Sequence, residues 1–297
     1  MLRIFLYEWQ NTNHSKIMVV FAVHRREVFL FIYNQINFKG EIIMENKELK
    51  YYSKIANWDF SQINSNEEVL IDWNYFDQIR KYTNGKSLCL DLGTGGGEEI
   101  FKNYPNVGMI IATDFSCEMI ATAKSNAKNH PEVNVKFTVM DNLNMKVPDN
   151  LFDLVSARHT VIDAKGIYKC LAPGGILVIE GVDQKDCWDL KELFGYGQAF
   201  NDEIAISQKD YQDLVNAGFS KIDLTEILVN EYYATPDDLM ALLLKAPILD
   251  DFSEITDMAS DHLELIDQNL FDQYVETHKT QKGILLKRVL YGIVAQK

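Results

Sequence analysis

The chain has 297 residues, 47% of them hydrophobic and 24% charged, which is ordinary for a globular protein that buries its own core. Its four cysteines form no CxxC pair, which argues against a zinc site or a secreted disulfide framework, and we expect a cytoplasmic protein. The net charge is −14, and residues 183–276 hold 22 acidic residues against five lysines and no arginine. Such a surface repels phosphate backbones and disfavours nucleic acid as a partner, although solubility alone also explains it.

The first 43 residues differ in character from the rest. Their two apolar runs, 18–23 and 28–33, fall short of the roughly 18–20 apolar residues that a membrane span needs, so we expect no membrane insertion. The segment also has no small-residue cleavage site of the kind a signal peptide carries. Residues 39–41 can be back-translated to contain a ribosome-binding GGAG shortly before Met44. We therefore expect residues 1–43 to be a non-native or disordered leader, with the native protein starting at Met44.

From residue 86 the chain alternates short apolar runs with helical stretches. The runs lie at 87–92, 108–113, 133–139, 152–156 and 175–180. This alternation predicts βαβ units with right-handed crossovers and a parallel sheet that is covered on both faces. A helix over 209–217 should end at Gly218, and two long strands should follow at 221–233 and 283–295.

A helical insertion is predicted between those two long strands. Thr235 can cap a helix, Pro236 suits its first turn, and two acids follow. The stretch is acidic and too long for a connector, so we interpret it as a lid. The expected organisation is a helical N-terminal cap at 44–85, an α/β core at 86–234, a helical lid at 235–281 and a final core strand at 282–297.

A glycine-rich turn, Asp91-Leu-Gly-Thr-Gly-Gly-Gly97, follows the first core strand. Glycines permit a sharp reversal and close approach of the backbone to a ligand. A dinucleotide would place its pyrophosphate at the start of the next helix, where Glu98 and Glu99 repel it. S-adenosylmethionine has no phosphate, and its sulfonium and ammonium suit Asp91. The charges therefore favour this methyl donor over a nicotinamide cofactor.

Acidic residues at the next two strand ends fit the same ligand. Asp114 follows the glycine turn by about 20 residues, where an acid commonly holds ribose hydroxyls. It could instead cap the next helix, a role for which Ser116 competes. Asp141 and Asn142 follow the third strand, where an acceptor can read the adenine amino group, although such a pair also suits a plain turn.

Five segments between residues 87 and 180 carry a family resemblance: LDLGTGGGE, ATDFSCEM, VMDN, FDLVSARH and LAPGGILVIE. They resemble the class I (Rossmann-like) S-adenosylmethionine-dependent methyltransferases, close to the type 11 group. The resemblance implies a mostly parallel seven-stranded sheet with an antiparallel last strand and helices on both faces. The connection from the fourth strand to the Gly174-Gly175 turn is short, which puts the usual intervening helix in question.

The resemblance also implies how S-adenosylmethionine is held. Asp91, Gly93 and Gly95 would line its methionine part. The other contacts that we expect are Thr94 in the turn, Asp114 and Phe115 near the ribose, Met119 packed on the adenine, and Asp141 and Asn142 at the adenine edge. Trp58 could help to cover the cofactor, or be a core aromatic.

The methyl acceptor is expected beside the ends of strands one and four, at the switch point of the sheet. There His159 could act as a general base and Arg158 could clamp a substrate carboxylate, or both could only brace the loop. We expect direct methyl transfer to a small or medium-sized acceptor, without a metal. An rRNA or tRNA methyltransferase with the same core and a non-catalytic S-adenosylmethionine-binding protein are the alternatives.

Overall fold

The computed structural model describes residues 3–11, 14–23, 26–30, 62–71, 73–249 and 266–297. Trp58 and the end of the expected leader lie outside these described residues. The three N-terminal strands, β1 (Arg3–Asn11), β2 (His14–Val23) and β3 (Arg26–Leu30), pair with one another in a separate antiparallel sheet. The origin of this segment as a leader stays a prediction.

The main sheet has nine strands among the described residues, in the order β4-β10-β12-β9-β8-β5-β6-β7, with β11 paired to β12. Their bounds are β4 (Ser65–Val69), β5 (Leu88–Leu92), β6 (Met109–Asp114), β7 (Val135–Val139), β8 (Phe152–Arg158), β9 (Leu171–Val182), β10 (Ser220–Tyr233), β11 (Lys279–Thr280) and β12 (Gly283–Gln296). Strands β5 to β9 pair in parallel, and β12 runs antiparallel between β9 and β10. The expected mostly parallel sheet is therefore confirmed, and β4 and β11 are additions to its seven strands.

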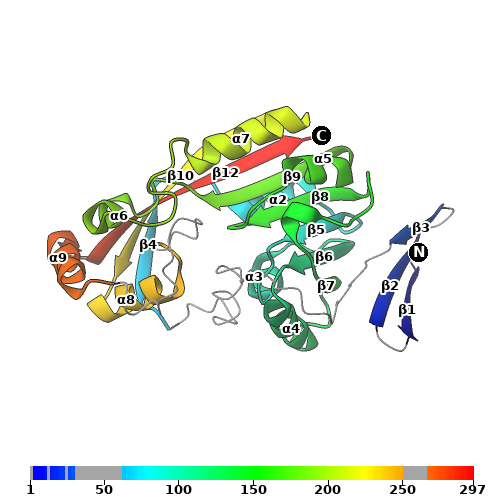
Figure 1. Ribbon diagram of the computed structural model, residues 1–297, viewed down its shortest axis with the longest axis horizontal. Coiled ribbons are helices and arrows are strands. Elements are labelled where there is room, and N and C mark those ends of the chain that lie inside the picture. Colours follow the sequence, from blue (N-terminus) through cyan, green and yellow to red (C-terminus); the bar gives the residue numbers. More distant parts are fainter. Residues whose placement is uncertain (1–2, 12–13, 24–25, 31–61, 72, 250–265) are drawn as a thin grey trace.

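Helices cover both faces of this sheet (Figure 1). One face packs against α2 (Tyr75–Tyr82), α3 (Glu98–Asn103) and α4 (Cys117–Asn126), and the other against α5 (Ala164–Cys170) and α7 (Ile206–Ala217). Successive strand residues point to opposite faces, so Leu154 of β8 joins the first core and Val155 the second. Two short 3-10 turns, η1 (Ala127–Asn129) and η2 (Asn142–Asn144), complete this part. The short connection between β8 and β9 does hold a helix, α5, because two turns suffice to cross the sheet.

The helix boundaries follow the local sequence. Ser116 is the N-cap of α4, and its hydroxyl accepts the N–H of Met119 at 3.2 Å. Helix α7 ends at Gly218, whose φ of 103° is left-handed. Thr235 caps α8 (Pro236–Lys245), and its reciprocal bonds with Asp238 form a capping box. These starts and stops therefore depend on residues within one turn.

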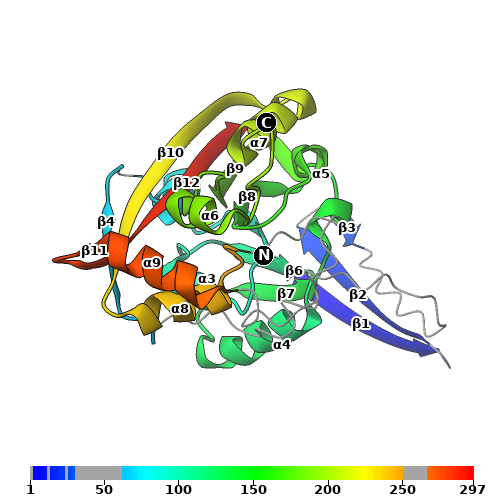
Figure 2. The same cartoon turned by 60° about the vertical axis from the view of Figure 1, so that its left-hand side comes forward.

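Strands β10 and β12 extend beyond the parallel core. β10 pairs with β12 along residues 284–296, whereas β9 pairs only with residues 290–296 of β12. On its other side, β10 is bordered by β4. Helices α6 (Trp188–Phe194), α8 and α9 (Gln268–His278) pack on this extension around a third apolar core (Figures 1 and 2). We call these helices, with β4, β11 and the paired ends of β10 and β12, the arm.

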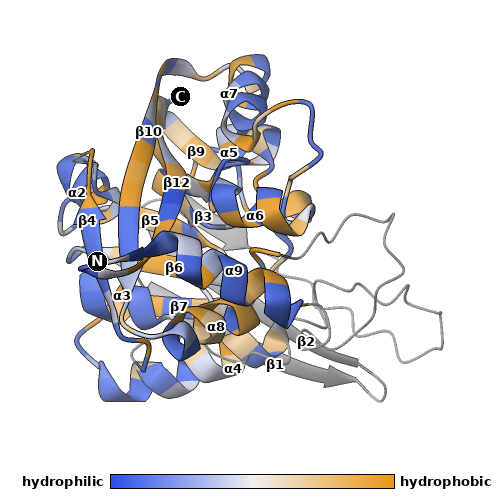
Figure 3. Cartoon of the chain, turned by 90° about the vertical axis from the view of Figure 1, so that its left-hand side faces the viewer, coloured by the Kyte–Doolittle hydropathy of each residue, from blue (hydrophilic) through white to orange (hydrophobic). Residues whose placement is uncertain are grey.

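The predicted lid and cap contribute to this arm. The 235–281 segment supplies α8 and α9, and the 44–85 segment contains the strand β4 as well as the helix α2. Hydrophobic residues concentrate on the strands, and helices such as α7 present many hydrophilic residues (Figure 3). None of the helices in the described ranges has the length and hydrophobicity of a membrane span.

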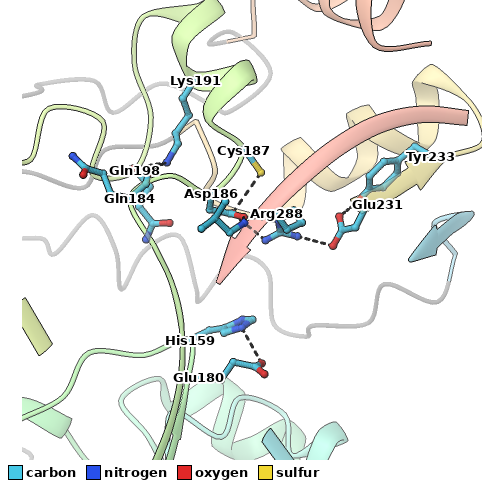
Figure 4. Close-up of polar contacts among 11 residues, drawn as sticks. His159, Glu180, Gln184, Asp186, Cys187, Lys191, Gln198, Glu231, Tyr233 and Arg288 are labelled. Carbon is cyan, nitrogen blue, oxygen red and sulfur yellow. Dashed lines mark hydrogen bonds and ion pairs between the residues drawn. The ribbon is translucent and has the colours of Figure 1, made fainter. Parts of the chain in front are cut away.

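Buried charges hold the parts of the arm together (Figure 4). Arg288 of β12 donates from Nε and Nη2 to both carboxylate oxygens of Asp186, at 2.9 and 3.1 Å, and from Nη1 to Glu231 at 2.9 Å. The Asp186 carboxylate also accepts the Val289 N–H at 2.9 Å, and Tyr233 donates to Glu231. Lys191, which is 2% exposed, donates to the carbonyls of Gln184 and Gln198. The start of α6 is therefore held against β12 by paired charges and charge-assisted hydrogen bonds.

Replacing Leu154 by Ala should lower the free energy of unfolding by about 2–5 kcal/mol, because this side chain is fully buried at the centre of the sheet. The matched control is Leu224→Ala on β10, where the side chain is 40% exposed, with an expected loss of about 1 kcal/mol or less. Urea denaturation with an unchanged m-value measures both. Equal losses in the two variants would contradict the assignment of Leu154 to the core.

Candidate functional site

The glycine turn joins β5 to α3 in a conformation that needs glycine. Gly93 and Gly95 have φ values of 70° and 57°, in the left-handed region. A Cβ atom on Gly93 would also lie 2.6 Å from the Cβ of Thr160. The turn is tied to its surroundings by the Thr94 N–H, which donates to the Thr113 carbonyl at 2.8 Å, and by Asn126, which donates to the Gly96 carbonyl. Its backbone is therefore fixed beside the ends of β5 and β6.

Asp91 lies beneath this turn and is 8% exposed. The Ser156 hydroxyl donates to its carboxylate at 2.7 Å and lies 3.0 Å from the Tyr104 hydroxyl. Since Ser156 gives its single proton to Asp91, Tyr104 must donate to Ser156. Burial raises the pKa of Asp91 to about 6, and the hydrogen bond from Ser156 opposes that rise.

Asp114 ends β6 and is 7% exposed. One carboxylate oxygen accepts the Gly95 N–H and the other the Ser116 N–H, each at 2.9 Å. Burial raises the pKa of Asp114, and the two N–H groups oppose the rise. The acid predicted to hold a ribose thus also braces the glycine turn, while Ser116 caps the helix.

The predicted pair Asp141 and Asn142 divides into two environments. Asp141 is exposed and accepts the Leu143 N–H at 2.9 Å as the cap of η2. Asn142 is 7% exposed and donates to Thr160 and to the Val161 carbonyl, at 3.0 and 3.3 Å. Its side-chain oxygen is buried and has no hydrogen-bond partner among the described residues. Asn142 therefore offers a free acceptor, whereas Asp141 stabilises a turn.

The remaining predicted contacts lie near these groups. Phe115 is partly buried between Asp114 and the Ser116 cap. Met119, on the first turn of α4, is 1% exposed. Glu98 and Glu99 occupy the first turn of α3, directly after the glycines. The carboxylates used to argue against a phosphate-bearing cofactor thus stand where the sequence predicted them.

His159 and Arg158 meet at one carboxylate, that of Glu180 on β9 (Figure 4 shows His159 and Glu180). Glu180 is 2.6 Å from Nε of Arg158 and 3.3 Å from Nε2 of His159. Burial alone would raise the pKa of Glu180, but His159 and Arg158 lower it to about 2. Desolvation lowers the pKa of His159 although 37% of its side chain is exposed. His159 also has a left-handed φ of 51°, and its N–H donates to the Glu180 carbonyl.

Several residues at the site were missed by sequence reasoning. Ser156 and Glu180 lie in two predicted strands whose carboxyl ends border the site, and this position was their only signal. Tyr104 is the C-cap of α3 and Tyr75 is the first residue of α2, and neither belongs to a recognisable motif. Tyr75 is 3% exposed, and its hydroxyl has no hydrogen-bond partner in the described part of the chain.

The part of the chain that contains this site is similar to methyltransferases. Residues 83–229 match a family model described as a methyltransferase domain. The 2-phytyl-1,4-naphthoquinone methyltransferase of Nostoc punctiforme is 28% identical over 125 residues, 38% of this chain and 54% of that protein. Phosphoethanolamine N-methyltransferase 3 of Arabidopsis thaliana is 26% identical over 149 residues, 43% of this chain and 30% of that protein. The chain thus spans about half or less of these curated relatives.

Several solved structures also align with this chain. Phosphoethanolamine N-methyltransferase 2 of Haemonchus contortus, in complex with S-adenosyl-L-methionine, aligns over 95% of this chain and 63% of its own, with 17% identity and a TM-score of 0.46. The [4+2]-cyclase SpnF aligns over 75% of this chain and 80% of its own, with 18% identity and a TM-score of 0.48. The match to the methyltransferase domain, over residues 83–229, spans the strands that carry the glycine turn and its acids.

Proposed function

We propose that this chain binds S-adenosylmethionine at the glycine turn and transfers its methyl group to a small or medium-sized acceptor. The observation that carries the proposal is the pair of buried carboxylates, Asp91 and Asp114, held at neighbouring strand ends around a left-handed glycine turn. The curated relatives are named for a naphthoquinone and for phosphoethanolamine, two chemically unlike acceptors. These relatives support methyl transfer as the reaction, but they do not point to one particular acceptor.

The residues present fit this donor. Asp91 offers negative charge to the amino-acid end, where an ammonium needs a counter-charge. Asp114 would accept from ribose hydroxyls, as expected for an acid at the end of the second core strand. The side-chain oxygen of Asn142 is a buried acceptor with no partner among the residues that the structure describes, which suits the adenine amino group. Glu98 and Glu99, at the start of α3, disfavour a pyrophosphate.

His159 is the proposed general base. When bound, S-adenosylmethionine supplies an electrophilic methyl group on a sulfonium. Since Glu180 is ionised, Nε2 of His159 donates to it, which leaves Nδ1 with a lone pair for the proton of an attacking hydroxyl or amine. Its lowered pKa keeps this ring neutral at pH 7. Glu180 orients the ring through its carboxylate, and its carbonyl accepts the backbone N–H of His159.

Asp114→Ala should weaken S-adenosylmethionine binding about ten- to a hundredfold, because it removes a charged acceptor from the ribose. Isothermal titration calorimetry measures this, with Asp213→Ala on the exposed side of α7 as a control that keeps wild-type affinity. Thermal unfolding must show that the variant is folded, since Asp114 also binds the turn. An unchanged affinity in folded Asp114→Ala would refute this site.

Donor binding should weaken as the pH falls through about 6. The pKa of Asp91 is raised to about 6, so its carboxyl loses its charge below that pH and no longer attracts the ammonium. Titrations between about pH 5 and 8 should show this fall in the wild type and a flatter profile in Asp91→Asn. Parallel pH profiles of donor affinity in the wild type and in Asp91→Asn would show that Asp91 does not bind the donor.

His159→Gln should lower kcat about 10²- to 10⁴-fold while donor affinity stays within about twofold. His130→Gln, at a half-exposed ring stacked on Phe101, is the matched control. The assay follows donor consumption over a panel of small hydroxyl, amine and carbon acids. Equal turnover in His159→Gln and His130→Gln would show that His159 only stabilises its loop. Donor binding without turnover on any acceptor would favour a non-catalytic binding protein.

A further inference from the structure

Arg158 projects toward the donor side of the sheet. Side chains two residues apart on a strand share a face, so Leu154, Ser156 and Arg158 of β8 point the same way. Leu154 packs in the core that includes Tyr75 of α2, and Ser156 bonds to Asp91. Arg158 is the last of the three, at the carboxyl end of β8. Its side chain therefore lies on the face that α2 covers, next to the glycine turn.

The guanidinium of Arg158 is only partly used. Nε bonds to Glu180 at 2.6 Å, and the two terminal NH₂ groups have no partner among the described residues. Its side chain is 37% exposed, so a ligand can reach it. An arginine anchored in this way presents a planar pair of donors that matches a carboxylate.

Tyr75 adds a hydroxyl to the same place. It lies in the first turn of α2, is 3% exposed, and its oxygen has no hydrogen-bond partner in the described ranges. The Ser156 hydroxyl is near enough to act on the Tyr75 pKa, but it is already engaged with Tyr104 and Asp91. The charges of Asp91 and Arg158 act on the same phenol. The Tyr75 hydroxyl therefore keeps a proton that it can donate to a ligand on this face of the sheet.

The charge balance of the site calls for such a group. The donor's amino-acid end carries a carboxylate as well as an ammonium, and Asp91 and Asp114 would repel that carboxylate. Arg158 is the cation whose charge acts on Asp91. A buried anion without a paired cation is costly, so the site needs a positive group here.

We propose that Arg158 and Tyr75 together bind the carboxylate of the methyl donor. The proposal rests on the proposed donor site and moves Arg158 from the acceptor, where sequence reasoning placed it, to the donor. Glu180 then has two tasks, since it holds Arg158 through Nε and orients His159. Arg158 and Tyr75 are binding residues in this assignment, with no proton transfer required of them.

The test removes the carboxylate from the ligand and its partners from the protein. Calorimetry compares S-adenosylmethionine with decarboxylated S-adenosylmethionine on the wild type, Arg158→Gln, Arg158→Lys and Tyr75→Phe. The wild type should prefer the carboxylated ligand about ten- to a hundredfold. Arg158→Gln should lose that preference by weakening only the carboxylated ligand, Arg158→Lys should keep part of it, and Tyr75→Phe should reduce it.

Arg80→Gln is the matched control, because Arg80 lies on the exposed side of α2 and pairs with Asp77. It should keep the wild-type preference, and Arg158→Gln should stay folded because His159 still pairs with Glu180. Equal preference in the wild type and Arg158→Gln would overturn the assignment while leaving the donor site intact. Failure of the wild type to bind either ligand would overturn the proposed function and this inference together.

Discussion

The site depends on the burial of two carboxylates beside a left-handed turn. Removing a carboxylate from water costs several kcal/mol unless hydrogen bonds replace the lost hydration. Ser156 supplies that bond for Asp91, and the N–H groups of Gly95 and Ser116 supply it for Asp114. The acids lie on β5 and β6, and their partners lie on β8, in the glycine turn and at the N-cap of α4. These bonds therefore hold the turn and the strand ends in one arrangement. That arrangement provides the negative charge for a cationic ligand.

The arm is built differently from the core, and its own elements are also held together by buried charge. Strands β10 and β12 continue past β9, so the arm has its own apolar core and no parallel neighbour. Arg288 joins Asp186 at the start of α6 to Glu231 on β10. Removing one partner would leave an unpaired buried charge, which is more costly than the pair is stabilising. Figure 4 shows this cluster above the His159–Glu180 pair.

The strands of the core sheet could be predicted from the sequence, but only part of the arm and of the site could. The five parallel strands, the helix stop at Gly218 and the Thr235 cap followed from local patterns, and the structure confirms them. Strand β4 was not predicted, because its residues, SNEEV, are polar and exposed and carry no apolar pattern. Helix α5 was not predicted, because the connection between β8 and β9 is short. For β4, pairing with β10 rather than propensity decides the element.

The amino-acid sequence by itself determined the sheet, the glycine turn and the acids around it, because strand period, glycine conformation and charge are properties of neighbouring residues. Only the tertiary structure decided which polar groups are engaged and which are free. Asp91 and Ser156 are 65 positions apart, and Arg158 and Glu180 are 22 apart, so no local pattern could pair them. The same holds for Asn142 and Tyr75, whose buried side-chain oxygens have no partner in the part of the chain that the structure describes. Burial and pairing depend on which strands become neighbours, and that order exists only in the folded chain.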